Sequence, residues 1–529
     1  MNQVYYNGKI LTMEDDEMVE SVLVRDGIIV EVGKYKDIVN KSPYVERIDL
    51  NGNTMIPAFI DSHSHFSGVA NGLLQIPLGE TVSVEEIVER INKYIKTHNL
   101  KENEWVSGEG YDNNNFKGKV HPTCEDLDRA SKNFPIMIQH KSRHVGVFNS
   151  KALEILGITI DTPSPKGGLI EKKDNKLTGY MEENAFTYYI REVPFPDDDD
   201  LLRAYIKAQK KYLSYGITTV QEGFMVEELI PSYKLLIKNN LLKIDLVGYS
   251  EVSSADKLQE IFRNSIMKYN KHFKLGGYKI FLDGSPQEST AWMITPYLGR
   301  DDYYGYGTMD YKDVCNAIRE ATKRKLQILA HCNGDAAAKQ YINAIKEVKS
   351  EGYNVSILRP VMIHAQLLRV DQLPEVKEEG IIPSFFIAHI YHWGDLHIKN
   401  YGCDRASKIS PAGSALKNNI CFTFHQDSPV IDPDMIETIH CAVNRITKRG
   451  ILLGKYEKIS VSEALKAVTI NAAFQYFEED KKGSIKEGKN ADFVILDKNP
   501  LEVVSNEIRD IKVLETIKDG NSVFKAKCN

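Results

Sequence analysis

Short runs of apolar residues alternate with longer amphipathic stretches through the central part of this sequence. Alternation of this kind is typical of βαβ units, in which each apolar run is a buried strand of a parallel sheet. The runs are residues 55–61, 216–221, 243–249, 278–282, 326–330, 360–363, 381–386 and 420–424. Eight strands close a (β/α)8, or TIM, barrel. We therefore predict an α/β fold whose main domain is a TIM barrel over residues 55–481.

The two ends of the chain show a different pattern, in which apolar and polar residues alternate between tight turns. Residues 4–32 contain an Asn-Gly pair and an Asp-Gly pair, and residues 511–524 contain another Asp-Gly pair. These dipeptides favour two-residue β-hairpin turns. Strands without partners would leave exposed sheet edges, so we expect the two ends to pair with each other. The sequence thus predicts one small β-sandwich composed of residues 1–54 and 482–529.

A long interval separates the first apolar run, which ends at residue 61, from the second, which begins at residue 216. It is too long for a simple crossover between barrel strands. We predict a segment inserted after the first barrel strand, over about residues 68–200. Its apolar spacing predicts an amphipathic helix at residues 84–97. The acidic residues 197–200 are typical of the first turn of a helix, where carboxylates favour the helix dipole.

Composition narrows the class of protein without identifying it. Of 529 residues, 42% are hydrophobic and 26% are charged, which is typical of a globular protein. The formal net charge is -6 and the basic residues are scattered, so we expect no nucleic-acid partner. No secretory leader or long uncharged apolar run is evident, and the seven cysteines form no CxxC pair. We therefore expect a cytoplasmic protein that does not insert into membranes.

Polar residues capable of metal chemistry follow the first apolar run. Asp61, His63 and His65 lie two residues apart, and alternate residues of a strand project to the same side. Active sites of TIM barrels lie at the carboxyl ends of the strands. A single pair of histidines at this spacing is weak evidence, because it occurs by chance in long chains.

Other predicted barrel strands carry similar residues at or near their ends. The fourth run contains Lys279 and is followed by an Asp-Gly pair, and the remaining residues are His331 after the fifth run, His364 after the sixth, and His425 and Asp427 after the eighth. Imidazole and carboxylate groups suit a divalent metal such as zinc, which lowers the pKa of bound water to about 7. The sequence therefore predicts a metal site at the barrel mouth.

Motifs along nearly the whole chain resemble those of a known family. They are PAFIDSHSH, HVGVFNSKAL, GGLIE, GITTVQEG, YKIFLDGS, AHCNGD, IHAQ, HWGD, FHQDSPV and GSIKEGKNADFVILD. As a set they resemble the amidohydrolase superfamily of metal-dependent hydrolases, and specifically its amidohydrolase-3 branch, whose YtcJ-like members include N-substituted formamide deformylase. The resemblance implies a metal-dependent hydrolase TIM barrel with a terminal β-sandwich. It says little about the substrate, because the branch acts on varied amide and related bonds.

The resemblance also assigns metal ligands. It implies that one or two divalent ions, with zinc as our expectation, are bound by His63, His65, Lys279, His331, His364 and Asp427. In such proteins the strand-4 lysine, here Lys279, can be carboxylated so that it bridges two ions. The alternative is a structural lysine beside a single ion. One departure is His425-Gln426, where many members have Gly-Ser before the aspartate.

The function that the resemblance implies is hydrolysis of an amide C–N bond in an N-acyl or N-formyl amine, at a metal that activates water. Asp427 is expected to act as general acid and base, with His364 or His425 steadying the developing oxyanion. A deaminase or cyclic-amide hydrolase remains an alternative, as does a regulator that binds a ligand without turnover. The expected partner is a small-molecule amide, with a homodimer left open. The candidates for substrate contact are His144, Glu222, His389, His392, Trp393 and His425.

Overall fold

The computed structural model describes residues 2–14, 18–98, 100–101, 103–194 and 197–527. Eight parallel strands form its central sheet, in chain order from first to last. The strands are β8 (Phe59–Ile60), β15 (Ile217–Met225), β16 (Asp245–Glu251), β17 (Phe273–Phe281), β18 (Gln327–Cys332), β19 (Val361–His364), β20 (Ile382–Phe385) and β21 (Thr423–Phe424). Just beyond the strand ends, the Ser62 hydroxyl donates to the Phe424 carbonyl oxygen over 2.9 Å, which brings β8 and β21 together. The predicted TIM barrel is confirmed.

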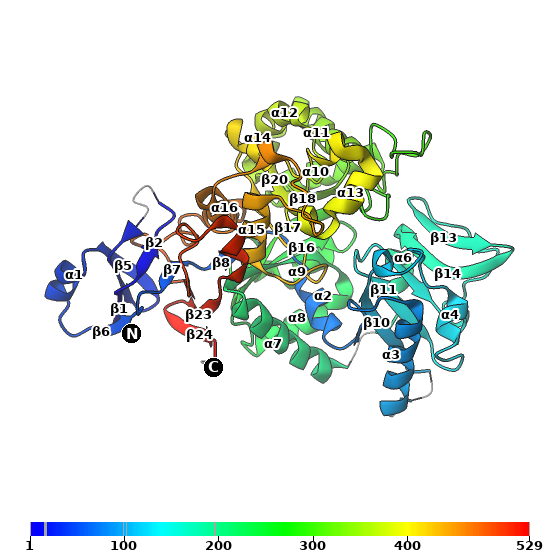
Figure 1. The fold of residues 1–529 in the computed structure, drawn as a ribbon, viewed down its shortest axis with the longest axis horizontal. Coiled ribbons are helices and arrows are strands. Elements are labelled where there is room, and N and C mark those ends of the chain that lie inside the picture. The colour runs from blue at the N-terminus through cyan, green and yellow to red at the C-terminus, as the bar shows by residue number, and fades with distance from the viewer. Residues whose placement is uncertain (1, 15–17, 99, 102, 195–196, 528–529) are drawn as a thin grey trace.

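Helices connect the barrel strands and cover the outside of the sheet (Figure 1). The buried strand residues are mostly apolar on both faces, as expected for a parallel sheet enclosed by helices. The helices after the insertion are α7 (Asp198–Ser214), α8 (Ile230–Lys238), α9 (Ala255–Ile261), α10 (Tyr311–Arg324), α11 (Asp335–Ser350), α12 (Leu373–Glu378), α13 (His389–Ala406), α14 (Ala412–Lys417), α15 (Met435–Asn444), α16 (Val461–Ala467) and α17 (Ile470–Gln475). The acidic run predicted to begin a helix lies at the start of α7, where Asp197 accepts a hydrogen bond from the Asp200 amide.

Strands from both ends of the chain form the terminal β domain, on one side of the barrel (Figure 1). One sheet has the order β5-β4-β1-β6 and the other β24-β23-β22-β7-β2-β3. The two sheets share a core, in which the rings of Tyr5 and Phe493 lie 5.5 Å apart. The strands are β1 (Asn2–Tyr6), β2 (Lys9–Leu11), β3 (Met18–Val19), β4 (Ser21–Arg25), β5 (Ile28–Gly33), β6 (Glu46–Asp49), β7 (Thr54–Pro57), β22 (Phe493–Leu496), β23 (Val513–Lys518) and β24 (Asn521–Lys525), with helix α1 (Tyr35–Lys41).

The first predicted barrel strand, residues 55–61, is corrected by this pairing. β7 pairs with β2 and β22 in the terminal sheet, and only the two residues of β8 join the barrel. Apolar residues on both sides of Ala58 continue one hydrophobic run, so the sequence did not reveal that the chain leaves one sheet and enters another. The residue limits of the domains stay a prediction.

The inserted segment forms a separate α/β unit on the opposite side of the barrel from the termini (Figure 1). Its sheet has the order β13-β14-β12-β11-β10-β9, and it has a core of its own. Helix α3 (Val84–Thr97) forms where the apolar spacing predicts it, and Ser83 caps its first turn. Helix α2 (Phe66–Gly72) leads into the insertion but packs on α7 and shares the barrel core. The other elements of the insertion are β9 (Ile76–Pro77), β10 (Val106–Tyr111), α4 (Cys124–Asp128), β11 (Ile136–His140), β12 (Val145–Phe148), α5 (Ser150–Ile155), β13 (Gly168–Lys173), β14 (Lys176–Glu183) and α6 (Asn184–Ile190).

Two further features of the described residues concern membrane-spanning helices and cysteines. No helix in the described part of the chain is long and apolar enough to cross a membrane. Six of the seven cysteines lie in that part and are free thiols, whereas Cys528 lies outside the described residues.

Candidate active site

Two histidines and an aspartate meet at the carboxyl ends of the first and last barrel strands. Nε2 of His63 lies 3.3 Å from Oδ1 of Asp427, and Nε2 of His65 lies 3.4 Å from the same oxygen. Their ligand atoms all lie within 4.8 Å of one another. The residues are far apart in sequence, but β8 and β21 are neighbours in the closed barrel. The closure of the barrel therefore assembles this group.

The other predicted ligands surround the same point. Nε2 of His364 lies 3.9 Å from Oδ2 of Asp427, and Nζ of Lys279 lies 3.3 Å from Nε2 of His63. The rings of His331 and His364 are 4.6 Å apart. His364 and Asp427 both have positive φ angles, 70° and 53°, which are uncommon for residues other than glycine. The structure brings all six predicted metal-binding residues together at one barrel mouth.

Hydrogen bonds behind two of the imidazoles direct their second nitrogen into this site. Nδ1 of His63 lies 2.6 Å from Oε1 of Gln221, whose amide nitrogen donates to the Ser62 carbonyl. Nδ1 of His331 lies 3.2 Å from a carboxylate oxygen of Asp283. Because both partners accept, each Nδ1 carries the proton and each Nε2 is the unprotonated nitrogen. That is the form of histidine that binds a metal. Nε2 of His63 lies 3.3 Å from Nζ of Lys279, and Nε2 of His331 lies 3.3 Å from the amide nitrogen of Asn333.

Electrostatics favour the same protonation states. Burial, reinforced by neighbouring positive groups, lowers the pKa of His63, His331 and His364 well below the ordinary value, so these imidazoles are neutral at pH 7. Burial would raise the pKa of Asp427. The close contact with His65, with further contributions from His425 and Lys279, outweighs that effect and leaves the pKa lowered. Asp427 is therefore a carboxylate at neutral pH, beside the neutral imidazoles of His63 and His364.

The donor set fits a divalent metal. Oδ1 of Asp427 is buried and has no hydrogen-bond partner among the described residues, although a buried carboxylate oxygen ordinarily has one. A cation between this oxygen and the imidazole nitrogens would satisfy it. Neutral imidazoles with a carboxylate are ligands that zinc accepts.

A cavity of about 1610 Å³ opens above these residues, between the barrel mouth and the insertion. His65, Lys279, His331, His364 and Asp427 lie in its wall. The insertion contributes further wall residues, among them Arg143, His144, Glu183 and Phe186. A cavity of this size holds a ligand considerably larger than a single amide group.

Comparison with known proteins places the chain in a family. The sequence model of the amidohydrolase family, in its amidohydrolase-3 branch, matches residues 46–524. The chain belongs to the amidohydrolase family. This confirms the predicted resemblance and supports a metal-dependent hydrolase.

Individual members of the family match over almost their full length. YtcJ of Bacillus subtilis is 27% identical over 549 aligned residues, which cover 99% of this chain and 100% of YtcJ. N-substituted formamide deformylase of Arthrobacter pascens is 25% identical, covering 97% of this chain and 96% of that protein. The crystal structure of an uncharacterized metal-dependent hydrolase from Pyrococcus horikoshii superposes with a TM-score of 0.77 at 25% identity, covering 96% of this chain and 99% of that one.

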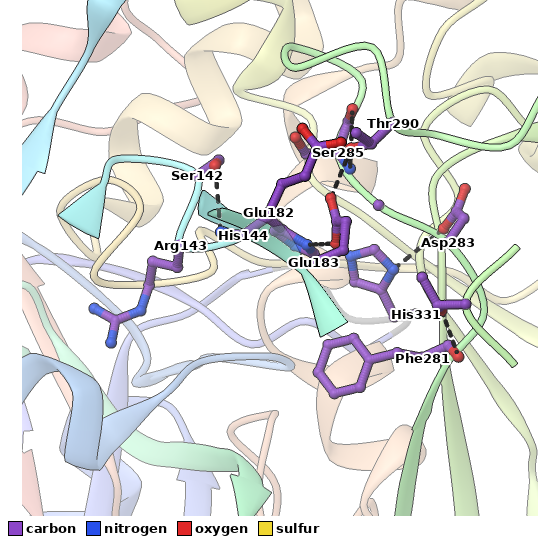
Figure 2. Close-up of polar contacts among 12 residues, drawn as sticks. Ser142, Arg143, His144, Glu182, Glu183, Phe281, Asp283, Ser285, Thr290 and His331 are labelled. Atoms are coloured by element: carbon purple, nitrogen blue, oxygen red, sulfur yellow. Dashed lines mark hydrogen bonds and ion pairs between the residues drawn. The ribbon is translucent and has the colours of Figure 1, made fainter. Parts of the chain in front are cut away.

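Among the predicted substrate contacts of this amidohydrolase, His144 and Glu222 line the cavity. Figure 2 shows His144 and Glu183 of the insertion beside His331 and Asp283 of the barrel. Nδ1 of His144 is 2.7 Å from Glu183, and the His144 ring lies 5.0 Å from that of His331. The His144 ring thus lies against a predicted metal ligand.

Glu183 is held in an unusual backbone conformation beside the cavity. Its φ and ψ are 50° and −124°, and its second carboxylate oxygen accepts a hydrogen bond from Thr290 over 2.7 Å. Such conformations cost energy and persist where the surroundings enforce them. Glu183 therefore links the insertion to the barrel loop after β17. Glu222, in contrast, accepts hydrogen bonds from the Ser67 amide and the Tyr233 hydroxyl.

Four other predicted contacts do not line this cavity: His389, His392, Trp393 and His425. The first three belong to α13, where His389 hydrogen-bonds His397 and the Trp393 ring packs on His389 at 4.5 Å. His425 is fully buried behind His364. Helix α13 begins four residues after the last residue of β20; it buries His389 and Trp393 and leaves His392 partly exposed, 3.1 Å from Glu437. The role of all six residues in substrate contact stays a prediction, and His144 and Glu222 are the two that line the cavity.

Three residues of the site were not assigned a role from sequence: Gln221, Asp283 and Glu183. Gln221 and Asp283 lie in or just after barrel strands, at the same end as the histidines, so their position was a usable signal. Glu183 belongs to the insertion, whose position over the barrel mouth no local sequence pattern indicates.

Proposed function

We propose that this amidohydrolase cleaves the C–N bond of an N-acyl or N-formyl amine. The observation that carries the proposal is the unpartnered Oδ1 of Asp427, which faces two imidazole nitrogens at the floor of a large cavity. The activity named for N-substituted formamide deformylase, similar over nearly the whole chain, supports a C–N bond as the target.

His63, His65, His331, His364 and Asp427 would hold the metal, for which we propose zinc, as one or two ions. When bound, the metal supplies Lewis acidity that activates water and polarises a carbonyl oxygen. Asp427, a carboxylate at neutral pH, takes the proton of the attacking water and returns it to the leaving nitrogen. The neutral imidazoles of His63, His331 and His364 each keep a ring nitrogen that can bind the metal without first losing a proton.

Lys279 is proposed to be carboxylated. Burial lowers the pKa of its ammonium group to about 7, so a large fraction is the free amine at neutral pH. A free amine adds carbon dioxide and releases one proton, giving a carbamate. This replaces a cation beside His63 with an anion that suits metal binding.

His144 is proposed to contact the substrate. It lies in the cavity wall and is oriented by Glu183, and Nε2 has no hydrogen-bond partner among the described residues. The insertion then serves to complete the substrate pocket that the barrel begins, with Phe186 among its apolar wall residues.

The test combines metal analysis with a substrate screen. Purified protein is loaded with zinc, its metal content is measured, and amine release is followed for a set of N-formyl, N-acetyl and N-aminoacyl amines. We expect amine release that is lost, together with the metal, in His63→Ala/His65→Ala. His98→Ala, at an exposed histidine after α3, is the matched control and should retain both.

Two outcomes would overturn the proposal. Release of ammonia without an acid product would indicate deamination. Protein that binds no zinc or manganese under these conditions would exclude the metal site and favour a ligand-binding role.

A further inference from the structure

A chain of buried polar side chains runs behind His364, away from the cavity. Nδ1 of His364 is 3.0 Å from Nε2 of His425, and Nδ1 of His425 is 2.9 Å from the Ser384 hydroxyl. The Ser384 and Ser62 hydroxyls are 3.0 Å apart, and the Ser62 hydroxyl lies 2.9 Å from the Phe424 carbonyl oxygen. Both serines and His425 are fully buried.

The carbonyl oxygen at the end of this series of hydrogen bonds determines which atom donates in each of them. A carbonyl oxygen can only accept, so Ser62 donates its single proton to Phe424. Ser62 can then only accept from Ser384. Since Ser384 has thereby used its own proton, it accepts from Nδ1 of His425. Nε2 of His425 is left as an acceptor.

The same order of donors decides the tautomer of His364. Its Nδ1 must donate to Nε2 of His425, so its proton lies on Nδ1 and its Nε2 has a free lone pair. That nitrogen points toward Asp427, 3.9 Å from Oδ2. Neutral histidine binds a metal through the nitrogen without a proton.

We propose that Ser62 and Ser384 are positioning residues, which act through His425 to hold His364 in its metal-binding tautomer. The inference rests on the proposed function, in which His364 is a metal ligand. It gives a role to strand β20, which carries no predicted ligand of its own. Ser384 on β20 serves a ligand on β19 through His425, which follows β21.

The decisive variant is Ser62→Ala, which is two side chains removed from His364. Without Ser62 as acceptor, the Ser384 hydroxyl can donate its proton to Nδ1 of His425. Nε2 of His425 then donates to Nδ1 of His364, and the His364 proton moves to Nε2. We expect zinc affinity, measured by competition with a chelating indicator, to fall about tenfold or more, as for losses of other outer partners of metal ligands. Ser384→Ala, which removes the acceptor for His425, should also lower the affinity.

Ser250→Ala is the matched control. Ser250 is a buried serine of β16 whose hydroxyl has no hydrogen-bond partner among the described residues, so its loss should leave zinc affinity unchanged. Equal zinc affinities for Ser62→Ala, Ser384→Ala and Ser250→Ala would overturn the inference.

A spectroscopic readout separates this role from a merely structural one. In metal-free protein with 15N-labelled histidine, ring nitrogen shifts report which nitrogen of His364 carries the proton, with the signal assigned by its loss in His364→Gln. We expect a proton on Nδ1 in the wild type and on Nε2 in Ser62→Ala. A wild-type proton on Nε2 would overturn the inference even if zinc binds, whereas failure of the wild type to bind zinc would overturn the proposed function.

Discussion

The barrel has a buried charged cluster at each end, and the two differ in how completely their charges are matched. The mouth cluster consists of His63, His65, His364, Lys279 and Asp427. The base cluster lies at the amino ends of the barrel strands and consists of Asp245, Lys274, Glu478, Lys482, Asp492 and Lys518. In the base cluster Asp245 accepts from Lys482 and Lys518 over 2.5 and 2.9 Å, and Lys518 also reaches Asp492 over 3.2 Å.

Two equally buried lysines show what the difference means. Lys279 and Lys518 are 1% and 3% exposed. Burial lowers the pKa of Lys279 to about 7, because Asp427 compensates it only in part. Burial also disfavours the charge of Lys518, but the carboxylates of Asp245 and Asp492 outweigh it and raise the pKa. The arrangement of carboxylates, more than burial, thus decides the charge of a buried lysine.

The contrast agrees with a general feature of TIM barrels. Active-site residues lie at the carboxyl ends of the strands, and residues at the amino ends contribute to stability. Lys518 belongs to β23, and Asp245 begins β16, so the base cluster joins the terminal domain to the barrel. Its charges are paired within the chain. Each cluster has one buried carboxylate oxygen without a hydrogen bond among the described residues, Oε2 of Glu478 and Oδ1 of Asp427. Oε2 of Glu478 lies 2.9 Å from the Lys482 ammonium group, whereas Oδ1 of Asp427 lies 3.3 and 3.4 Å from ring nitrogens of His63 and His65.

The largest expected effect is that of Asp427→Asn on turnover. Loss of the general acid and base should reduce kcat about 10³-fold, because an amide side chain cannot accept the proton of the attacking water. Steady-state kinetics on zinc-loaded protein, with metal content measured in parallel, check the prediction. Wild-type turnover in this variant would assign the proton transfer to another residue.

For Asp245→Asn in the base cluster we expect the opposite pattern, in which stability falls and turnover is retained. Removing this carboxylate leaves Lys482 and Lys518 with less compensation in a buried site, which should cost about 3 kcal/mol of stability. Activity per folded molecule should remain. Chemical denaturation of the variant measures the loss, and Asp256→Asn provides the control. Asp256 pairs with Arg324 at the surface, where such a pair contributes about 1 kcal/mol or less. Equal losses in both variants would remove the distinction between the base cluster and a surface pair.

The mouth cluster was predictable because its residues obey a simple rule of position. Each follows or lies in an apolar run, and the carboxyl ends of parallel strands meet at one face. The six residues expected to bind metal therefore converge in the structure without any long-range information. The fold followed from the same runs, except where β7 and β8 share one apolar stretch.

The base cluster and the pocket wall were not predictable in this way. Lys482 and Lys518 resemble surface lysines in sequence, and only the docking of the terminal strands on the barrel buries them. Similarly, His144 and Glu183 lie near the mouth because the insertion packs there, whereas His392 and Trp393 follow a strand yet turn away on α13. Contacts between separately folded units depend on tertiary packing that local periodicity does not encode.

The smallest expected effect concerns the pH dependence of stability in metal-free protein at low carbon dioxide. Unfolding returns Lys279 from a pKa of about 7 to about 10.5, so between these values the unfolded chain binds more protons than the folded one. Stability conferred at this position therefore rises with pH, by on the order of 1 to 2 kcal/mol from pH 7.5 to 9. Lys279→Met, which has no proton to lose, should lack that rise.

Lys518 does not contribute to this rise, because its pKa is raised above the unfolded value and the stability it confers is fully present at every pH below that value. Denaturation midpoints of wild type and Lys279→Met across this range test the sign, and parallel pH profiles would mean that Lys279 stays charged in the folded protein, as Lys518 does.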